Sequence, residues 1–203
     1  MLHLDHIAVA AETLDAGRAM VEGALGVALQ PGGQHAHFGT HNMLLGLEDG
    51  LYLEVIAIDP GAPKPCYARW FDLDRFQGKP RLSNWICRTD NLDREVAQFP
   101  AAGQPVALAR GDLRWKMAVP DDGILPYDNH FPALIEWQCT QHPAHLLAPS
   151  GCRLERLLIR HPHAGHLQAA LAPVLEDPRI VFETGPAALV AEIMTPLGQR
   201  VLE

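Results

Sequence analysis

The chain has few lysines and an acidic balance, and this excludes two classes of partner. Only three of its 203 residues are lysine, and acidic residues outnumber basic ones by 24 to 16, which gives a formal net charge of −8. A surface of this charge does not attract nucleic-acid phosphates or an anionic membrane. We therefore expect neither a nucleic acid nor a membrane as a partner.

Long apolar runs and closely spaced cysteines are also missing. No apolar run approaches the roughly 20 residues that a membrane-spanning helix needs. The segment MLHLDHIAVA has no basic region and no long apolar region, so we expect a strand there and no signal peptide. The four cysteines lie far apart without a Cys-x-x-Cys pair, which is typical of a reduced compartment. We expect a cytoplasmic protein.

The usual motifs of nucleotide-binding and hydrolase sites are absent. The sequence contains no GxGxxG, GxxxxGK(S/T), GxSxG or HExxH. Hydrophobic residues make up 48% and charged residues 20%, which is the composition of a globular protein. Histidine is unusually frequent, with eleven residues.

An internal repeat organises the chain. LDHIAVAAETLDAG begins at Leu4, and LSNWICRTDNLDRE begins 78 residues later at Leu82. Each segment is a short apolar run, a polar break and the start of a helix. Thr13 and Asn91 stand where a helix N-cap is expected, because their side chains can accept hydrogen bonds from free backbone N–H groups. Two helices of roughly a dozen residues should follow.

Extended segments follow each expected helix. In the first repeat an Asp49-Gly50 pair between two apolar runs predicts a hairpin. The element order is therefore βαβββ at residues 1–60, and again at about 80–140. A third, shorter βαβββ-like unit spans about 150–203. Antiparallel hairpins with one helix per unit predict an α+β fold.

The residues that define the repeat also carry a family resemblance. LDHIAVA, GGQHAHFGTHNMLL and LYLEVIAI in the first unit, with NWICRTDNLD and FPALIEWQ in the second, resemble the vicinal oxygen chelate superfamily and its glyoxalase-like branch. The resemblance implies tandem βαβββ modules whose curled mixed sheets surround a central cavity. It also implies a small-molecule ligand and, in many members, a divalent metal in that cavity.

Three ionisable residues lie in the middle of strands that otherwise consist of apolar residues. They are His6, Glu54 and Glu136. A carboxylate on a buried strand is costly unless it is paired or bound to a metal. One histidine and two carboxylates suit Zn, Ni, Mn or Fe(II), so we expect the three to face one cavity and share such an ion. The alternative is that they face solvent or each other.

The resemblance implies a fourth ligand position at Asn84, which matches His6 in the second unit. A neutral amide is a weak ligand for a transition metal, so this position departs from the family pattern. Arg156 stands at the matching place in the third unit, where a permanent cation cannot be a ligand. We expect the third unit to lack a metal site and either to cover a sheet edge or to pair with its copy in a homodimer.

Several further residues are candidates for ligand binding. His35, His41 and Asn42 cluster after a Gly-Gly pair, and the resemblance places His35 and Asn42 at the cavity mouth. An arginine at a cavity rim can bind a carboxylate, for which Arg88 and Arg114 are candidates. Aromatic walls are expected from a set of three tryptophans, namely Trp85, Trp115 and Trp137. The histidines from His142 onward are interpreted as parts of a loop and of a helix N-terminus.

Two function classes remain open from the sequence. The first is a metal-dependent lyase or isomerase that acts on a small carbonyl or vicinal-oxygen substrate, with Glu136 or Glu54 as the general base. The second is a metal-free protein that binds or sequesters a small molecule, of the bleomycin-resistance type. The fold supports many functions, so the reaction rests on analogy.

Overall fold

The two sequence repeats fold into the two halves of one eight-stranded sheet. The structure is a computed structural model that describes residues 1–203. The first half contains β1 (His3–Ala10), α1 (Leu14–Leu25), β2 (Gln30–His35), β3 (Thr40–Leu47) and β4 (Leu51–Ile58). The second half contains β5 (Arg81–Arg88), α2 (Leu92–Gln98), β6 (Gln104–Arg110), β7 (Leu113–Val119) and β8 (Ala133–Trp137). A 3₁₀ turn at Trp70–Asp72 lies in the connection between the halves, and another at Pro100–Ala102 follows α2.

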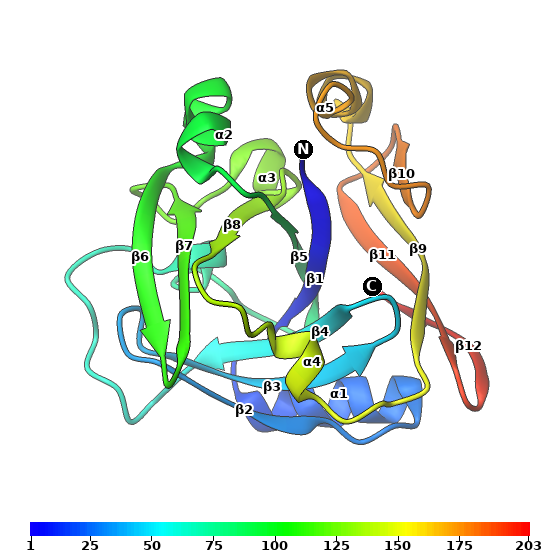
Figure 1. Cartoon of the computed structure of the whole chain (residues 1–203). Helices are drawn as coiled ribbons and strands as arrows, with labels where there is room; N and C mark the ends of the chain where they lie inside the picture. The colour runs from blue at the N-terminus through cyan, green and yellow to red at the C-terminus, as the bar shows by residue number, and fades with distance from the viewer.

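The strand order is the same in both halves. The sheet runs β2-β3-β4-β1-β5-β8-β7-β6, and the halves join where β1 pairs antiparallel with β5. Within each half the first strand pairs parallel with the last one, β1 with β4 and β5 with β8. Figure 1 shows the sheet curling, so that the edge strands β2 and β6 come close to each other. The expected α+β fold with two tandem modules is confirmed.

The two residues predicted as helix N-caps do cap their helices. The Thr13 hydroxyl accepts from the amide of Ala16 at 3.2 Å, and the Asn91 side chain accepts from the amide of Arg94 at 2.9 Å. Helix α1 has the expected length of 12 residues, but α2 has only seven. Pro100 explains the early end of α2, because proline has no amide hydrogen to continue the helical bonding.

The third unit repeats the element order but not the strand pairing. It consists of β9 (Arg153–Arg160), α5 (Ala164–Leu171), β10 (Ile180–Glu183), β11 (Ala188–Thr195) and β12 (Gly198–Leu202), preceded by the short helix α4 (Pro143–Leu146). Its sheet runs β10-β9-β11-β12, so its first strand has a neighbour on both sides within the unit. In the other units the first strand has only the last strand as a neighbour within the unit.

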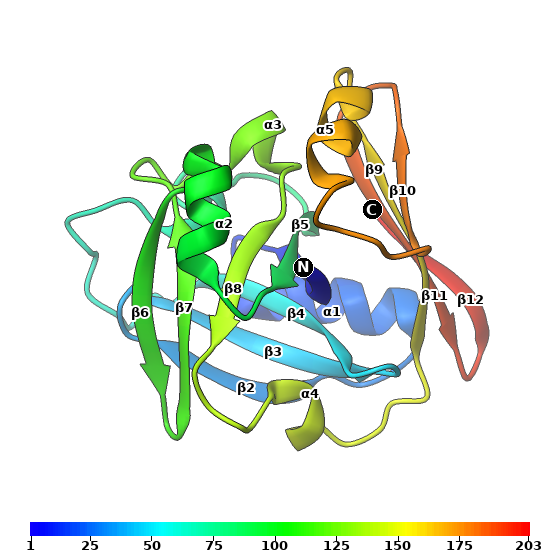
Figure 2. The ribbon, with the colours of Figure 1, turned by 45° about the horizontal axis from the view of Figure 1, so that its top comes forward.

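The third unit forms a separate layer against the outer face of β5. Figures 1 and 2 place β9–β12 on one side of the molecule and β6 and β7 on the other. Trp85 of β5 meets Phe182 of β10 in an edge-on contact, with ring centroids 6.4 Å apart. No helix of the structure is long and apolar enough to cross a membrane.

Helix α1 covers the outer face of β4 and packs closely on it. A Cβ atom added to Gly17 would lie 2.5 Å from Cγ1 of Val55 and 2.9 Å from Cβ of Ala11. Gly23, in the same helix, has nothing within 4 Å. The strand packed against Gly17 is thus the one that carries Glu54.

These two glycines give a matched test of the helix–sheet contact. We expect Gly17→Ala to lower the free energy of unfolding by about 1–3 kcal/mol, because the methyl group overpacks the contact with Val55. We expect Gly23→Ala to raise it by about 0.5–1 kcal/mol, because alanine loses less backbone entropy in a helix. Urea denaturation followed by circular dichroism measures both. Equal effects of the two substitutions would contradict the packing.

Candidate functional site

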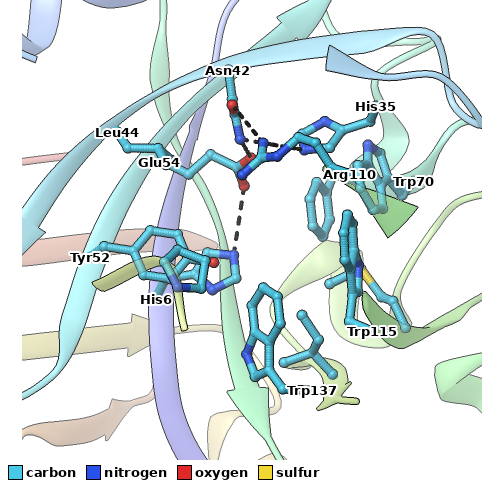
Figure 3. A pocket seen from close by; sticks show the side chains of 14 residues that line it. His6, His35, Asn42, Leu44, Tyr52, Glu54, Trp70, Arg110, Trp115 and Trp137 are labelled. Carbon is cyan, nitrogen blue, oxygen red and sulfur yellow. Dashed lines mark hydrogen bonds and ion pairs between the residues drawn. The ribbon is translucent and has the colours of Figure 1, made fainter. Parts of the chain in front are cut away.

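A small recess, with a cavity volume of about 30 Å³, lies on the inner face of the curled sheet. Strands from both halves supply its walls, as Figure 3 shows. Side chains alternate between the faces of a strand, so residues two apart, such as Tyr52 and Glu54, reach it together. The polar lining residues are His6, His35, Asn42, Tyr52, Glu54 and Arg110, and the aromatic ones include Trp70, Phe71, Trp115 and Trp137.

A β-bulge places two neighbouring polar residues together beside the recess. The pairing of β1 with β5 shifts between Leu4 and His6, which leaves Asp5 as an extra residue. The bulge breaks the alternation of side chains, so Asp5 and His6 can meet. Oδ1 of Asp5 lies 2.6 Å from Nδ1 of His6, and Asp5 is completely buried. Sequence patterns did not indicate Asp5 as part of the site.

Asp5 is held by donors from distant parts of the chain. Its Oδ2 accepts from Nε1 of Trp137 at 3.1 Å and lies 2.9 Å from Nε2 of His142. Burial alone would raise the pKa of Asp5, but the hydrogen bonds and charges of His142 and His6 outweigh it and hold the pKa well below its ordinary value. The interpretation of His142 as part of a loop overlooked this contact.

His6 lies between two carboxylates. Its Nδ1 meets Asp5, and its Nε2 lies 3.6 Å from Oε2 of Glu54. The imidazole also stacks on Tyr52, with ring centroids 4.2 Å apart. Burial opposes protonation of His6, but the hydrogen bond to Asp5 and the negative charges of Asp5 and Glu54 raise its pKa above the ordinary value. His6 is therefore an imidazolium at slightly acidic pH, with one ring N–H directed toward Glu54.

Glu54 is a buried carboxylate that stays ionised. Its Oε1 accepts from Nδ2 of Asn42 at 2.6 Å, and its Oε2 faces His6. Burial would raise the pKa of Glu54, but His6, together with His35 and Asn42, lowers it to about 2. The 3.6 Å gap to His6 is too long for a hydrogen bond, so both groups can still engage a ligand atom.

Arg110 reaches the recess from the end of β6 and contacts the groups that hold Glu54. Its NH1 lies 3.2 Å from Nε2 of His35 and 3.2 Å from Oδ1 of Asn42. Because a guanidinium only donates, Nε2 of His35 accepts and its Nδ1–H donates to the Thr40 hydroxyl at 3.0 Å. Burial is the main reason that the pKa of His35 falls to about 4, so this ring is neutral.

Arg110 takes the place at the recess that was expected for Arg88 or Arg114. Arg88 lies behind the site: its NH1 donates to the carbonyl of Leu4 at 3.2 Å and is 3.6 Å from Asp5. Arg114 donates to backbone carbonyls near the turn that joins β6 and β7. No sequence pattern marks Arg110, which precedes Gly111 in the turn after β6, as a site residue. It reaches His35 only because the sheet curls.

Aromatic side chains close the recess opposite the charged groups. Trp115 and Trp137 line it, with ring centroids 5.7 Å apart, and His35 meets Trp70 edge-on at 5.0 Å. The expectation that Trp85 forms part of this wall is wrong. Trp85 faces outward, because it pairs with Ile7 on the opposite face of the sheet from the recess, and it packs on the third unit.

Glu136 does not join His6 and Glu54. Its neighbours Ile135 and Trp137 line the recess, and Oε2 of Glu136 accepts from the amide of Leu92 at 2.8 Å at the start of α2. The prediction that all three side chains face one cavity is therefore wrong. A carboxylate at a helix N-terminus has its own structural role, because it satisfies a free backbone N–H group.

Two other predicted ligand-binding residues also lie outside the recess. His41 is adjacent to Asn42 on β3, so its side chain is on the opposite face, where its Nε2 is buried without a partner. Asn84 lines a second cavity on the far side of Phe71. His35, Asn42 and Trp115 line the recess.

The donor set does not fit a three-ligand site for a divalent metal. Glu136 is on the other face of β8, and one oxygen of Glu54 is occupied by Asn42. The nearest further ring nitrogen, Nε2 of His35, already accepts from Arg110, whose permanent charge repels a second cation. The structure contains no group of three or more His, Cys, Asp or Glu side chains arranged to hold a metal.

Comparison with known proteins now assigns the family. The sequence model of the glyoxalase-like domain matches residues 4–175. The chain belongs to this family. It is thereby a member of the vicinal oxygen chelate superfamily, as the sequence motifs indicated. No curated protein matches the chain.

Solved structures share the fold of this glyoxalase-like protein at low sequence identity. A hypothetical protein from Staphylococcus aureus is 13% identical over 99% of this chain and 84% of that chain, with a TM-score of 0.60. Methylmalonyl-CoA epimerase from Mycobacterium tuberculosis is 19% identical over 66% of this chain and 85% of that chain, with a TM-score of 0.44. The corresponding enzyme from Streptomyces coelicolor has a TM-score of 0.44 at 15% identity, over 68% and 97% of the two chains. At 13% identity the likeness to the Staphylococcus aureus protein is one of fold.

The neutral state of His35 makes the stability of the protein depend on pH. The unfolded chain protonates this imidazole near the ordinary pKa of 6.5, whereas the folded protein does so only near 4. Between pH 6.5 and pH 4 the unfolded state binds more protons than the folded state. The free energy of unfolding therefore falls as the pH drops through this range. Between about pH 7 and pH 5 we expect the wild type to lose ~2 kcal/mol more unfolding free energy than His35→Gln.

Urea denaturation at both pH values measures this difference. Thr40→Val is the matched control: it removes the hydroxyl that accepts from Nδ1 but keeps the imidazole, so it should retain the pH dependence of the wild type. Parallel pH profiles for the wild type and His35→Gln would contradict a neutral, buried His35.

Proposed function

We propose that the protein moves a proton on a small carbonyl compound that carries a second oxygen on the neighbouring carbon, as a lyase or isomerase of the glyoxalase-like type. The observation that supports this is the 3.6 Å gap between Nε2 of His6 and Oε2 of Glu54 at the wall of a recess. A donor and an acceptor that face one small space can hold a carbonyl oxygen and the proton on the adjacent carbon.

In this mechanism Glu54 is the general base and His6 the general acid. Oε2 of Glu54 takes the proton from the carbon next to the carbonyl group, and the electrons of that C–H bond form a carbon–carbon double bond. The carbonyl oxygen receives the proton from Nε2 of His6, which gives an enediol. Return of the carbon proton to the other carbon, with the second hydroxyl proton passing to His6, completes an isomerisation.

The charges of the two residues make the transfers support each other. Glu54 is a weak base while His6 is charged, because His6 lowers its pKa to about 2. When His6 passes its proton to the substrate oxygen, that charge disappears, and burial then favours the protonated form of Glu54. Proton loss from His6 thus increases the basicity of Glu54 at the moment when it is needed. Asp5 orients the ring through Nδ1 and stabilises its charged form.

Arg110, His35 and Asn42 have a positioning role in this proposal. Asn42 holds one oxygen of Glu54, which leaves the other free to act. Arg110 uses NH1 for its two side-chain contacts, so its remaining N–H groups are free to donate to the second oxygen of the substrate. The aromatic side chains form the apolar wall that a small ligand needs.

Exchange of the carbon-bound proton with solvent deuterium tests this proposal even while the product is unidentified. Proton NMR would follow exchange in dihydroxyacetone, glyceraldehyde and hydroxypyruvate with the pure protein. We expect Glu54→Gln to lower the exchange rate about 100-fold or more, because it removes the base. Glu136→Gln is the matched control, since Glu136 lies on the other face of the sheet, and it should leave the rate unchanged.

The alternative function has a distinct outcome in the same experiment. A protein that only binds such compounds would shift their NMR signals without any exchange, and Glu54→Gln would change the affinity alone. Loss of exchange in Glu136→Gln but not in Glu54→Gln would contradict the assignment of the base.

The role of a metal is tested separately. Because the donor set does not fit a three-ligand site, we expect the exchange rate to be unchanged after treatment with EDTA and after addition of Zn, Ni or Mn. Elemental analysis before and after the chelator accompanies the rates. A rate that falls with EDTA and returns with one metal would instead support the metal-dependent lyase or isomerase that the family resemblance implies.

A further inference from the structure

A second cavity, with a volume of about 200 Å³, lies on the other side of Phe71 from the recess. Phe71 lines both spaces and separates them. Strand β5 contributes the segment 82–84, the connection between the halves contributes residues around Asp72 and Phe76, and the third unit contributes 187–189. Neither the glyoxalase-like fold nor the proton-transfer site requires it.

The side chain of Asn84, which lines this cavity, has unsatisfied hydrogen-bonding groups. The residue has no exposed surface, yet neither its amide nitrogen nor its amide oxygen has a hydrogen-bond partner in the protein. Burial of an amide without partners costs roughly 1–3 kcal/mol for each unsatisfied group. Asn84 is one of the residues that line the cavity, and its amide keeps a donor and an acceptor that no protein group uses.

His130 offers a second free acceptor. Its Nδ1 contacts the backbone carbonyls of Tyr127 at 3.0 Å and Asp128 at 2.9 Å, so Nδ1 carries the hydrogen and Nε2 the lone pair. Nε2 is buried and has no partner. Nε1 of Trp85 donates to the carbonyl of His130 at 2.8 Å and holds this segment next to β5, and His130 and Asn84 line the same cavity.

Arg81 supplies a positive charge that no carboxylate neutralises. Its guanidinium lies over the ring of Phe76 at 4.1 Å and donates only to the backbone carbonyls of Gln77 and Lys79. Arg75, in the same cavity wall, differs because its Nε and NH2 donate to the two carboxylate oxygens of Asp72 at 2.7 and 2.8 Å. An anionic group entering the cavity would find Arg81 available and Arg75 occupied.

The backbone around the cavity is unusual as well. Phe71 and Asp72 on one side, and Tyr127, Asp128 and Asn129 (the short turn α3, Pro126–Asn129) on the other, all have left-handed φ values between 52° and 66°. For residues other than glycine each such conformation costs of order 1 kcal/mol. Both strained segments border the same cavity, and they determine its shape.

We propose that the second cavity binds a small carboxylate that carries two hydroxyl groups. One hydroxyl donates to Nε2 of His130 and accepts from the Asn84 amide nitrogen, and the other donates to the Asn84 amide oxygen. The carboxylate pairs with Arg81, whose planar fork matches its two oxygens. Such a ligand satisfies every free polar group described above. The proposal does not depend on the reaction in the recess, because none of these three residues lines it.

Binding of glycerate to the whole protein tests the proposal. Glycerate has a carboxylate and two hydroxyls; propionate lacks the hydroxyls, and glycerol lacks the carboxylate. Isothermal titration calorimetry gives the affinities, and NMR follows the side-chain amide signals of Asn84. We expect glycerate to shift those signals and to bind at least about tenfold more tightly than either fragment, which corresponds to about 1.4 kcal/mol.

Variants separate a ligand site from a cavity that is merely hydrated. Asn84→Leu should abolish glycerate binding and raise the melting temperature, because it replaces an unsatisfied buried amide with an apolar side chain of similar size. Arg81→Gln should weaken binding at least about tenfold, and since Arg81 is exposed the fold is retained. Arg75→Gln is the matched control and should bind glycerate as the wild type does.

Three results would overturn the proposal. The first is no shift of the Asn84 signals by glycerate at millimolar concentration, which would mean that water alone occupies the cavity. The second is equal affinity for glycerate, propionate and glycerol. The third is an equal loss of affinity in Arg75→Gln and Arg81→Gln, because a general effect of positive charge would then explain the binding.

Discussion

The charge of Asp5, buried without any exposed surface, is the constraint on which the candidate site depends. A carboxylate can remain ionised there only if donors surround it, and these come from three separate places: His6 beside it, Trp137 at the end of β8 and His142 before α4. The same set of bonds joins the first half of the sheet to the second and ties down the connection to the third unit. Folding and the orientation of His6 are therefore linked through one side chain.

Local sequence patterns predicted the helices, the strands and their order. They did not predict which side chains of a strand face the recess. Thr13 and Asn91 cap helices because a cap depends only on residues three positions away. Whether a side chain faces the recess depends instead on strand register and bulges. Ala8 pairs with Glu54 across β1 and β4, while Ile86, which matches Ala8 in the repeat, pairs with Ala133. The structural counterpart of Glu54 is therefore Ala133, and Glu136, three positions further, falls on the opposite face.

The same reasoning explains why Asp5 and Arg110 were missed. Asp5 contacts its sequence neighbour His6 only because a bulge interrupts the strand, and no residue pattern in LDHIAVA indicates that bulge. Arg110 is separated from His35 by 75 positions, and the two meet because the edge strands β2 and β6 are brought together by the curl of the sheet. His35 and Asn42 could be predicted only through the family resemblance, since their Gly-Gly neighbourhood is equally typical of a solvent-exposed loop.

The two halves of the sheet have the same topology but very different electrostatics. The inner face of the first half presents His6 and Glu54, whereas the matching positions of the second half hold the neutral Asn84 and Ala133. Around the recess the charges of Asp5 and Glu54 are balanced by those of His6 and Arg110, so the entry of an uncharged carbonyl compound disturbs no ion pair. Because the second half carries no charge at the positions that match His6 and Glu54, only these two residues exchange protons with the substrate in the proposed reaction. The asymmetry of two otherwise equivalent halves thus confines the proposed chemistry to one side of the recess and leaves the amide of Asn84 available on the other side of Phe71.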